Sequence, residues 1–77
     1  MKYYARESEN VRRLVDMLYT KGPMTCKEIR LATGWTESVF IVTLTSASYL
    51  YDLYEIEGSR GTTVYGVNKK IRIDIEH

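Results

Sequence analysis

The side chains that could perform chemistry are few in this chain of 77 residues. Cys26 is its only cysteine, so it cannot form an internal disulfide or a cysteine-based zinc site. Its only histidine is the C-terminal His77, which by itself cannot build a metal site or a nucleophile–base pair. No glycine-rich phosphate loop occurs. Glu55 and Glu57 lie two positions apart, on one face of an expected strand, but a hairpin offers them no pocket for acid–base catalysis. We therefore expect neither an enzyme nor a cofactor.

Contact with nucleic acid is a different chemistry, and a few basic side chains indicate it. Arg60 lies within Gly58-Ser59-Arg60-Gly61, at the tip of an expected hairpin. Folding requires no charge at a loop tip, and an arginine there can enter a narrow minor groove of DNA. Lys27 and Arg30 lie one turn apart near the start of an expected short helix, where they could contact phosphates.

Three helices are predicted to position these side chains. Ser8 is a good N-cap, and the apolar residues after it follow the spacing of one helical face: Val11, Leu14, Val15 and Leu18. This pattern predicts a helix over 9–21, ended by Gly22 and Pro23.

The second helix is predicted from a capping box, in which Thr25 caps the helix and Glu28 reaches back to the amide of the cap. It ends at Thr33-Gly34, where glycine permits a sharp turn. Its inward residues are expected to be Ile29 and Ala32.

Thr36 is the predicted cap of a third helix, extending to about residue 50. Its apolar residues repeat with a helical period: Phe40, Leu44, Ala47 and Tyr51. Residues 38–45 are rich in β-branched side chains and also fit a strand, but the cap and the period together favour a helix.

The remaining elements are expected to be strands. Residues 53–57 and 62–67 are β-prone runs joined by the short glycine-bounded segment 58–61, which is typical of a hairpin. In the tail 68–77, Ile71, Ile73 and Ile75 alternate with charged residues, which predicts a half-buried strand. Residues 1–7 are expected to form an N-terminal arm.

In this order, residues 9–67 resemble the winged helix-turn-helix domains of small prokaryotic and archaeal (including viral) transcription regulators. The likeness rests on Gly22-Pro23-Met24-Thr25, Glu28-Ile29, Thr33-Gly34-Trp35-Thr36, Phe40, Leu44 and the segment 58–65. It implies an α+β fold of three helices followed by a β-hairpin wing, as a single domain over 1–77. Trp35 departs from the family, where a small apolar residue often follows the glycine of the turn.

The resemblance also implies a function. It implies a homodimer that binds double-stranded DNA sequence-specifically, with the helix after Thr36 in the major groove and the wing against the minor groove or the backbone. The side chains then expected to contact DNA are Lys27, Arg30, Thr36, Glu37, Ser38, Ile41, Val42, Thr45, Ser59, Arg60 and Thr62.

The charge of the chain departs from what this function usually requires. The formal net charge is only +1, and residues 36–50 contain no lysine or arginine and one acid, Glu37. DNA affinity depends strongly on phosphate neutralisation by basic side chains. An alternative is therefore that exposed Ile41 and Val42 belong to a protein–protein interaction module that does not bind DNA. A third is an RNA or single-strand binder that uses the seven tyrosines.

Composition sets the wider expectations. No apolar run approaches the ~20 residues of a membrane span, and the N-terminus lacks the apolar segment of a signal peptide, so a cytoplasmic protein is expected. The chain has no glutamine and only two asparagines, a trait of proteins from thermophiles. No metal or small-molecule ligand is indicated.

Overall fold

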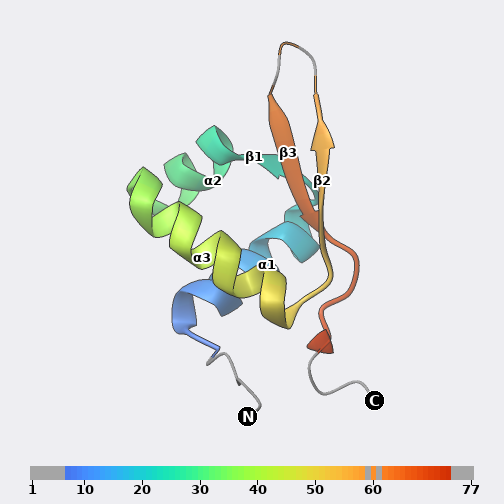
Figure 1. The fold of residues 1–77 in the computed structure, drawn as a ribbon. Coiled ribbons are helices and arrows are strands. Elements are labelled where there is room, and N and C mark those ends of the chain that lie inside the picture. Colours follow the sequence, from blue (N-terminus) through green and yellow to red (C-terminus); the bar gives the residue numbers. More distant parts are fainter. Residues whose placement is uncertain (1–6, 59, 61, 74–77) are drawn as a thin grey trace.

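The described part of the chain forms three helices and a three-stranded antiparallel sheet (Figure 1). The computed structural model describes residues 7–58, 60 and 62–73. The helices are α1 (Glu9–Lys21), α2 (Cys26–Thr33) and α3 (Glu37–Leu50), and the strands are β1 (Met24–Thr25), β2 (Leu53–Glu57) and β3 (Thr63–Val67). The α+β class is confirmed, and the arrangement is compatible with a winged helix-turn-helix.

Each helix begins at the cap that the sequence predicts. The Ser8 hydroxyl accepts a hydrogen bond from the Val11 amide at 3.1 Å. In α2 the capping box is complete, because the Glu28 amide donates to Thr25 Oγ1 at 3.1 Å and the Thr25 amide donates to Glu28 Oε1 at 2.9 Å. The Val39 amide donates to Thr36 Oγ1 at 3.2 Å. A cap side chain thus satisfies one first-turn amide at the N-terminus of each helix.

The sheet has the order β1-β3-β2, so β3 is its central strand. The β2–β3 hairpin aligns Leu53 with Val67 and Glu57 with Thr63. On the other side of β3, Met24 pairs with Tyr65 and Thr25 with Val64. The sequence analysis missed β1, which consists of two residues.

The tail does not form the strand that its alternating isoleucines predict. Within the described residues, 71–73 are not in a strand and Ile71 and Ile73 are exposed; 74–77 lie outside those residues. Both edges of β3 are already taken by β1 and β2. The tail instead contacts α1, where Lys70 forms an ion pair with Asp16. The expected arm 1–7 lies outside the described residues except for Glu7.

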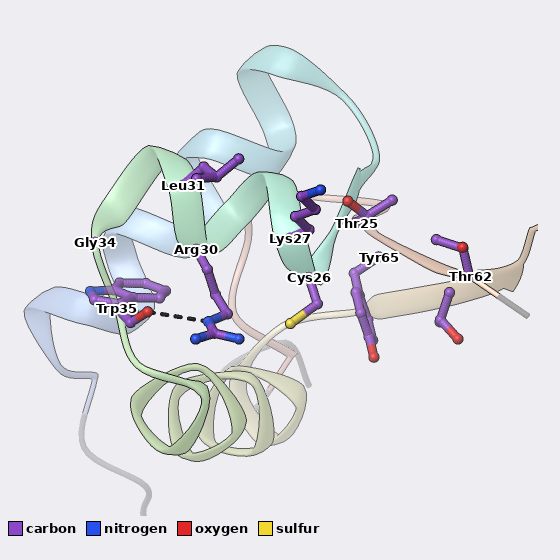
Figure 2. Close-up of a pocket in the computed structure, with 10 residues that line it drawn as sticks. Thr25, Cys26, Lys27, Arg30, Leu31, Gly34, Trp35, Thr62 and Tyr65 are labelled. Atoms are coloured by element: carbon purple, nitrogen blue, oxygen red, sulfur yellow. Dashed lines mark hydrogen bonds between the residues drawn. The ribbon is translucent and has the colours of Figure 1, made fainter.

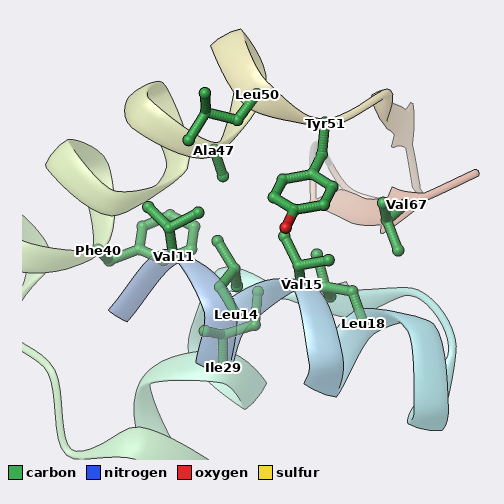
Figure 3. Close-up of a cluster of buried hydrophobic side chains, with 10 residues drawn as sticks. All are labelled: Val11, Leu14, Val15, Leu18, Ile29, Phe40, Ala47, Leu50, Tyr51 and Val67. Atoms are coloured by element: carbon green, nitrogen blue, oxygen red, sulfur yellow. The ribbon is translucent and has the colours of Figure 1, made fainter. Parts of the chain in front are cut away.

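The hydrophobic core lies between α1 and α3 and is closed by α2 and the sheet (Figure 3). The four apolar residues predicted for the inner face of 9–21 are all buried. From the other elements the core takes Ile29, Phe40, Ala47, Leu50, Tyr51 and Val67. Burial of such side chains contributes about 1.5–3 kcal/mol each, which is how a chain this short holds α3 in place.

Two predictions about inward positions are wrong in detail. Ala32 is exposed, because α2 is short and Ile29 is its one fully buried residue. In α3, Thr43 is buried while Leu44 is only half-buried. The buried stripe runs through Phe40, Thr43, Ala47 and Leu50, which turns the helix slightly from the orientation that its apolar residues alone suggest.

Candidate nucleic-acid interface

The outward face of α3 carries hydroxyl and apolar side chains but no lysine or arginine. Ser38, Ile41, Val42 and Thr45 are all exposed, on the side of the helix opposite its buried stripe. Ile41 is 52% exposed and Val42 65%. Glu37 is exposed in the first turn, and Thr36 is exposed with its hydroxyl engaged as the cap. The structure therefore brings the predicted α3 residues onto one accessible surface.

The turn between α2 and α3 is fixed by a set of local hydrogen bonds. Gly34 adopts the left-handed conformation at φ 79°, and its amide donates to the Arg30 carbonyl. The Thr33 hydroxyl donates to the Ile29 carbonyl and accepts from the Trp35 amide. Glycine suits this φ because it has no Cβ to clash with the backbone. These bonds set the direction in which α3 leaves the turn.

Arg30 forms a hydrogen bond within this turn and is also one of the predicted DNA-contacting residues. Its Nε donates to the Trp35 carbonyl oxygen at 3.3 Å, and the side chain is half-buried. Trp35 is itself half-buried and packs against the core, at the corner between the two helices. The guanidinium is thereby held close to α3 (Figure 2).

The hairpin tip holds the third predicted cation in an unusual backbone conformation. Arg60 is exposed and has φ 61°, the left-handed region, which costs a non-glycine residue about 1–2 kcal/mol. The loop is closed by the Gly58 amide, which donates to the Thr62 carbonyl. Thr62 is exposed; Ser59 lies outside the described residues. Lys27, on the first turn of α2, is exposed too.

Acidic side chains occupy the hairpin face that is turned toward α3. Tyr65 of β3 packs edge-on against Phe40 of α3, with ring centroids 5.6 Å apart. Glu55 lies directly opposite Tyr65 across the hairpin, so the two share this face, and Glu57 follows on the same side. Burial raises the pKa of Tyr65, and the negative charge of Glu55 raises it further. Any polyanion approaching α3 along the hairpin meets these two carboxylates.

Between α2 and the hairpin lies an open groove of about 800 Å³, called here the α2–hairpin groove (Figure 2). Ten residues line it: Thr25, Cys26, Lys27, Arg30, Leu31, Gly34, Trp35, Thr62, Thr63 and Tyr65. Arg30 and Cys26 extend from α2 toward α3, and Tyr65 faces them from β3. The groove thus brings three predicted DNA-contacting residues, Lys27, Arg30 and Thr62, to one cavity.

The α2–hairpin groove could not be predicted from the sequence. Its walls come from segments about 30 residues apart along the chain, and the pairing of Met24 with Tyr65 brings them together. The signal available in the sequence was the concentration of Cys26, Lys27, Arg30 and Trp35 within ten positions, but their common orientation depends on β1.

Neither a metal-binding cluster nor a membrane-spanning helix is found in the described part of the chain. There, no group of three or more His, Cys, Asp or Glu side chains could hold a metal ion. No helix among residues 7–58, 60 and 62–73 is long and apolar enough to cross a membrane.

Comparison with known proteins gives no relative for this chain. No family model matches it, and neither the curated proteins nor the solved structures contain a significant match.

Proposed function

We propose that the chain is a winged helix-turn-helix protein that binds double-stranded DNA as a small transcription regulator. In this proposal α3 enters the major groove and the β2–β3 hairpin is the wing. The observation that carries it is the exposed face of α3, which a fixed turn presents beside a hairpin tipped by Arg60. A major groove about 12 Å wide admits a helix of this kind.

The side chains of the α3 face suit base contacts more than phosphate contacts. The hydroxyls of Ser38 and Thr45 can donate to or accept from base edges, and Ile41 and Val42 can contact thymine methyl groups. Phosphate contacts fall to Lys27, Arg30 and Arg60, which flank this face on α2 and on the hairpin.

Such a small set of cations limits the electrostatic part of the affinity. Three phosphate contacts per protomer correspond to a slope of about −2.7 in log K against log salt, and two protomers would double it. A homodimer is part of the proposal for this reason, and also because a core this small gains stability from association. Sedimentation equilibrium of the free protein measures the oligomeric state.

The proposal is tested by fluorescence anisotropy with a random-sequence duplex at two salt concentrations. We expect binding at micromolar concentration or tighter that weakens as salt rises. Arg60→Ala should weaken it several-fold, whereas Arg13→Ala, an exposed change on α1, should have little effect. Absence of binding at low salt would reject DNA binding.

The exposed apolar residues favour a second candidate function, a protein–protein interaction module. Besides Ile41 and Val42, Leu31 is 78% exposed and Tyr49 65%, although neither is required for base contacts in the proposal above. Apolar contacts depend little on salt, so salt dependence separates the two functions. Under this alternative, Ile41→Ser and Val42→Ser would abolish association with a protein partner, and no duplex would bind.

A further inference from the structure

The α2–hairpin groove has the size and the mixed lining of a small-molecule site. Its volume of about 800 Å³ falls within the 300–1,000 Å³ that is usual for ligand pockets. It is open to solvent along one side, and its walls come from α2, the α2–α3 turn, β1 and the hairpin (Figure 2).

The charged lining of the groove has one sign only. Lys27 and Arg30 are its ionic residues, and no carboxylate is among the ten lining residues. Within the described part of the chain neither cation forms an ion pair with an acid. The side chains that line the groove are therefore electrostatically complementary to an anion, while Glu55 lies outside this lining, opposite Tyr65 across the hairpin.

Arg30 is preorganised for such a ligand. The hydrogen bond from its Nε to the Trp35 carbonyl leaves the two terminal amino groups of the guanidinium to donate elsewhere. A planar guanidinium held in this way can bind a carboxylate or phosphate through two parallel hydrogen bonds. Holding the side chain in advance lowers the entropy lost when the ligand binds.

The rest of the lining favours a ligand with a flat, apolar ring system. The rings of Trp35 and Tyr65 form apolar walls, and Cys26 Sγ adds a polarisable surface between them. Leu31 also lines the groove but is largely exposed. The hydroxyls of Thr25, Thr62 and Thr63 lie at the hairpin side, where they can hydrogen-bond polar substituents. Aromatic rings offer broad contact area to a planar ligand.

We propose that the α2–hairpin groove binds a small planar aromatic anion, with the anionic group on Arg30 and the aromatic body against Trp35. An aromatic carboxylate and a nucleoside monophosphate both have this chemistry. The proposal goes beyond DNA binding, and it is tested without DNA, so that either one can fail while the other stands.

Trp35 provides the readout, because it is the only tryptophan in the chain and gives a single indole N–H signal. The experiment titrates ¹⁵N-labelled protein with 2-naphthoate and, separately, with adenosine monophosphate, and follows this signal by ¹⁵N–¹H correlation spectra. The neutral controls are 2-naphthamide and adenosine. We expect at least one anion to shift the Trp35 signal in a saturable way and to bind at least tenfold more tightly than its neutral control. Which of the two binds identifies the source of the ligand.

Two variants test the assignment of the anionic group. Arg30→Met should weaken binding of the anion at least tenfold, while Arg13→Met, which removes a charge from the exposed side of α1, should leave it unchanged. Arg30 also hydrogen-bonds the Trp35 carbonyl, so its substitution could alter the α2–α3 turn. Lys27→Met therefore serves as a second variant at the groove and should weaken binding of the anion about two- to fivefold. Equal affinity for anion and neutral control in the unsubstituted protein, or no saturable shift with either anion, would overturn the proposal whatever the variants do.

Discussion

The Tyr51 hydroxyl donates a hydrogen bond to the carboxylate of Glu7, which joins the residue that ends α3 to the residue two positions before α1. Arg12 lies on the other oxygen of the same carboxylate, at 3.6 Å. The two long helices are thus linked at this end by a polar contact as well as by the core between them.

We expect the free energy of unfolding to fall at high pH because of this contact. Burial of Tyr51, the hydrogen bond to Glu7 and the negative charge of Glu7 raise the pKa of Tyr51 from 10.0 to about 12, against the opposing charges of Arg72 and Arg12. The neutral hydroxyl is required to donate. The contribution is therefore complete below pH 10, the pKa in the unfolded chain, and is lost as the pH rises from 10 to 12.

The loss should amount to roughly 2–3 kcal/mol, since each unit of pKa shift corresponds to about 1.4 kcal/mol. Urea denaturation between pH 8 and 12 measures it. Tyr51→Phe should lower stability by about 1–2 kcal/mol at pH 8 and flatten the fall above pH 10. A fall of the same size in the variant would assign the effect to the other tyrosines.

Arg60 is expected to strengthen DNA binding while lowering the stability of the fold. Its φ of 61° suits glycine, so Arg60→Gly should keep the stability of the protein or raise it by up to about 1 kcal/mol. DNA affinity should fall several-fold, as for Arg60→Ala, because both variants lose the cation. Thermal denaturation and duplex anisotropy on the same samples check the two effects. A stable Arg60→Gly variant with undiminished affinity would remove the hairpin tip from the binding mechanism.

Neutralising the acids of the hairpin should strengthen DNA binding. Glu55 and Glu57 lie on the face of the hairpin turned toward α3, where they repel phosphates in the proposed complex. Glu57→Gln is expected to raise affinity about two- to fivefold at low salt, and the gain should shrink as salt screens the charge. Glu9→Gln, on α1, is the matched control and should change little. Equal effects of the two substitutions would indicate that only net charge matters.

Gly66 is required by its neighbour across the hairpin. Tyr54 pairs with Gly66, and a Cβ added at Gly66 would lie within 2.3 Å of the Tyr54 ring. Gly66→Val should therefore lower stability by about 1–3 kcal/mol, the usual cost of overpacking. The loss should be smaller in the background Tyr54→Ser, where the ring is absent. A double-mutant cycle by chemical denaturation measures the coupling, and a coupling of zero would contradict the contact.

Local signals in the sequence predicted most of the helical part of the fold. The caps at Ser8, Thr25 and Thr36 act within three residues, so the helix starts follow from short-range hydrogen bonds alone. The strand range 53–57 is also as predicted, since glycine and β-prone residues mark a hairpin locally.

What the sequence could not supply are the relationships between distant segments. β1 exists because residues 24–25 meet β3, and two residues carry no periodicity of their own. The tail has a strand-like alternation with no free edge of β3 to pair with. The α2–hairpin groove was missed for the same reason, because its two walls are positioned by that distant pairing. On α3 the predicted contact residues do share an exposed face, as a helical period places them, and they carry no positive charge.

The position of β3 at the centre of the sheet has a consequence for biosynthesis. Of the three strands in the described part of the chain, β3 is synthesised after β1 and β2, and both depend on it for their pairing. The backbone of Met24 cannot form its strand pairing until Tyr65, about 40 residues later, has been synthesised. During translation the three helices can form early while the α2–hairpin groove and the hairpin do not yet exist. A nascent chain would acquire the α2–hairpin groove and the wing only after the residues of β3 have emerged from the exit tunnel.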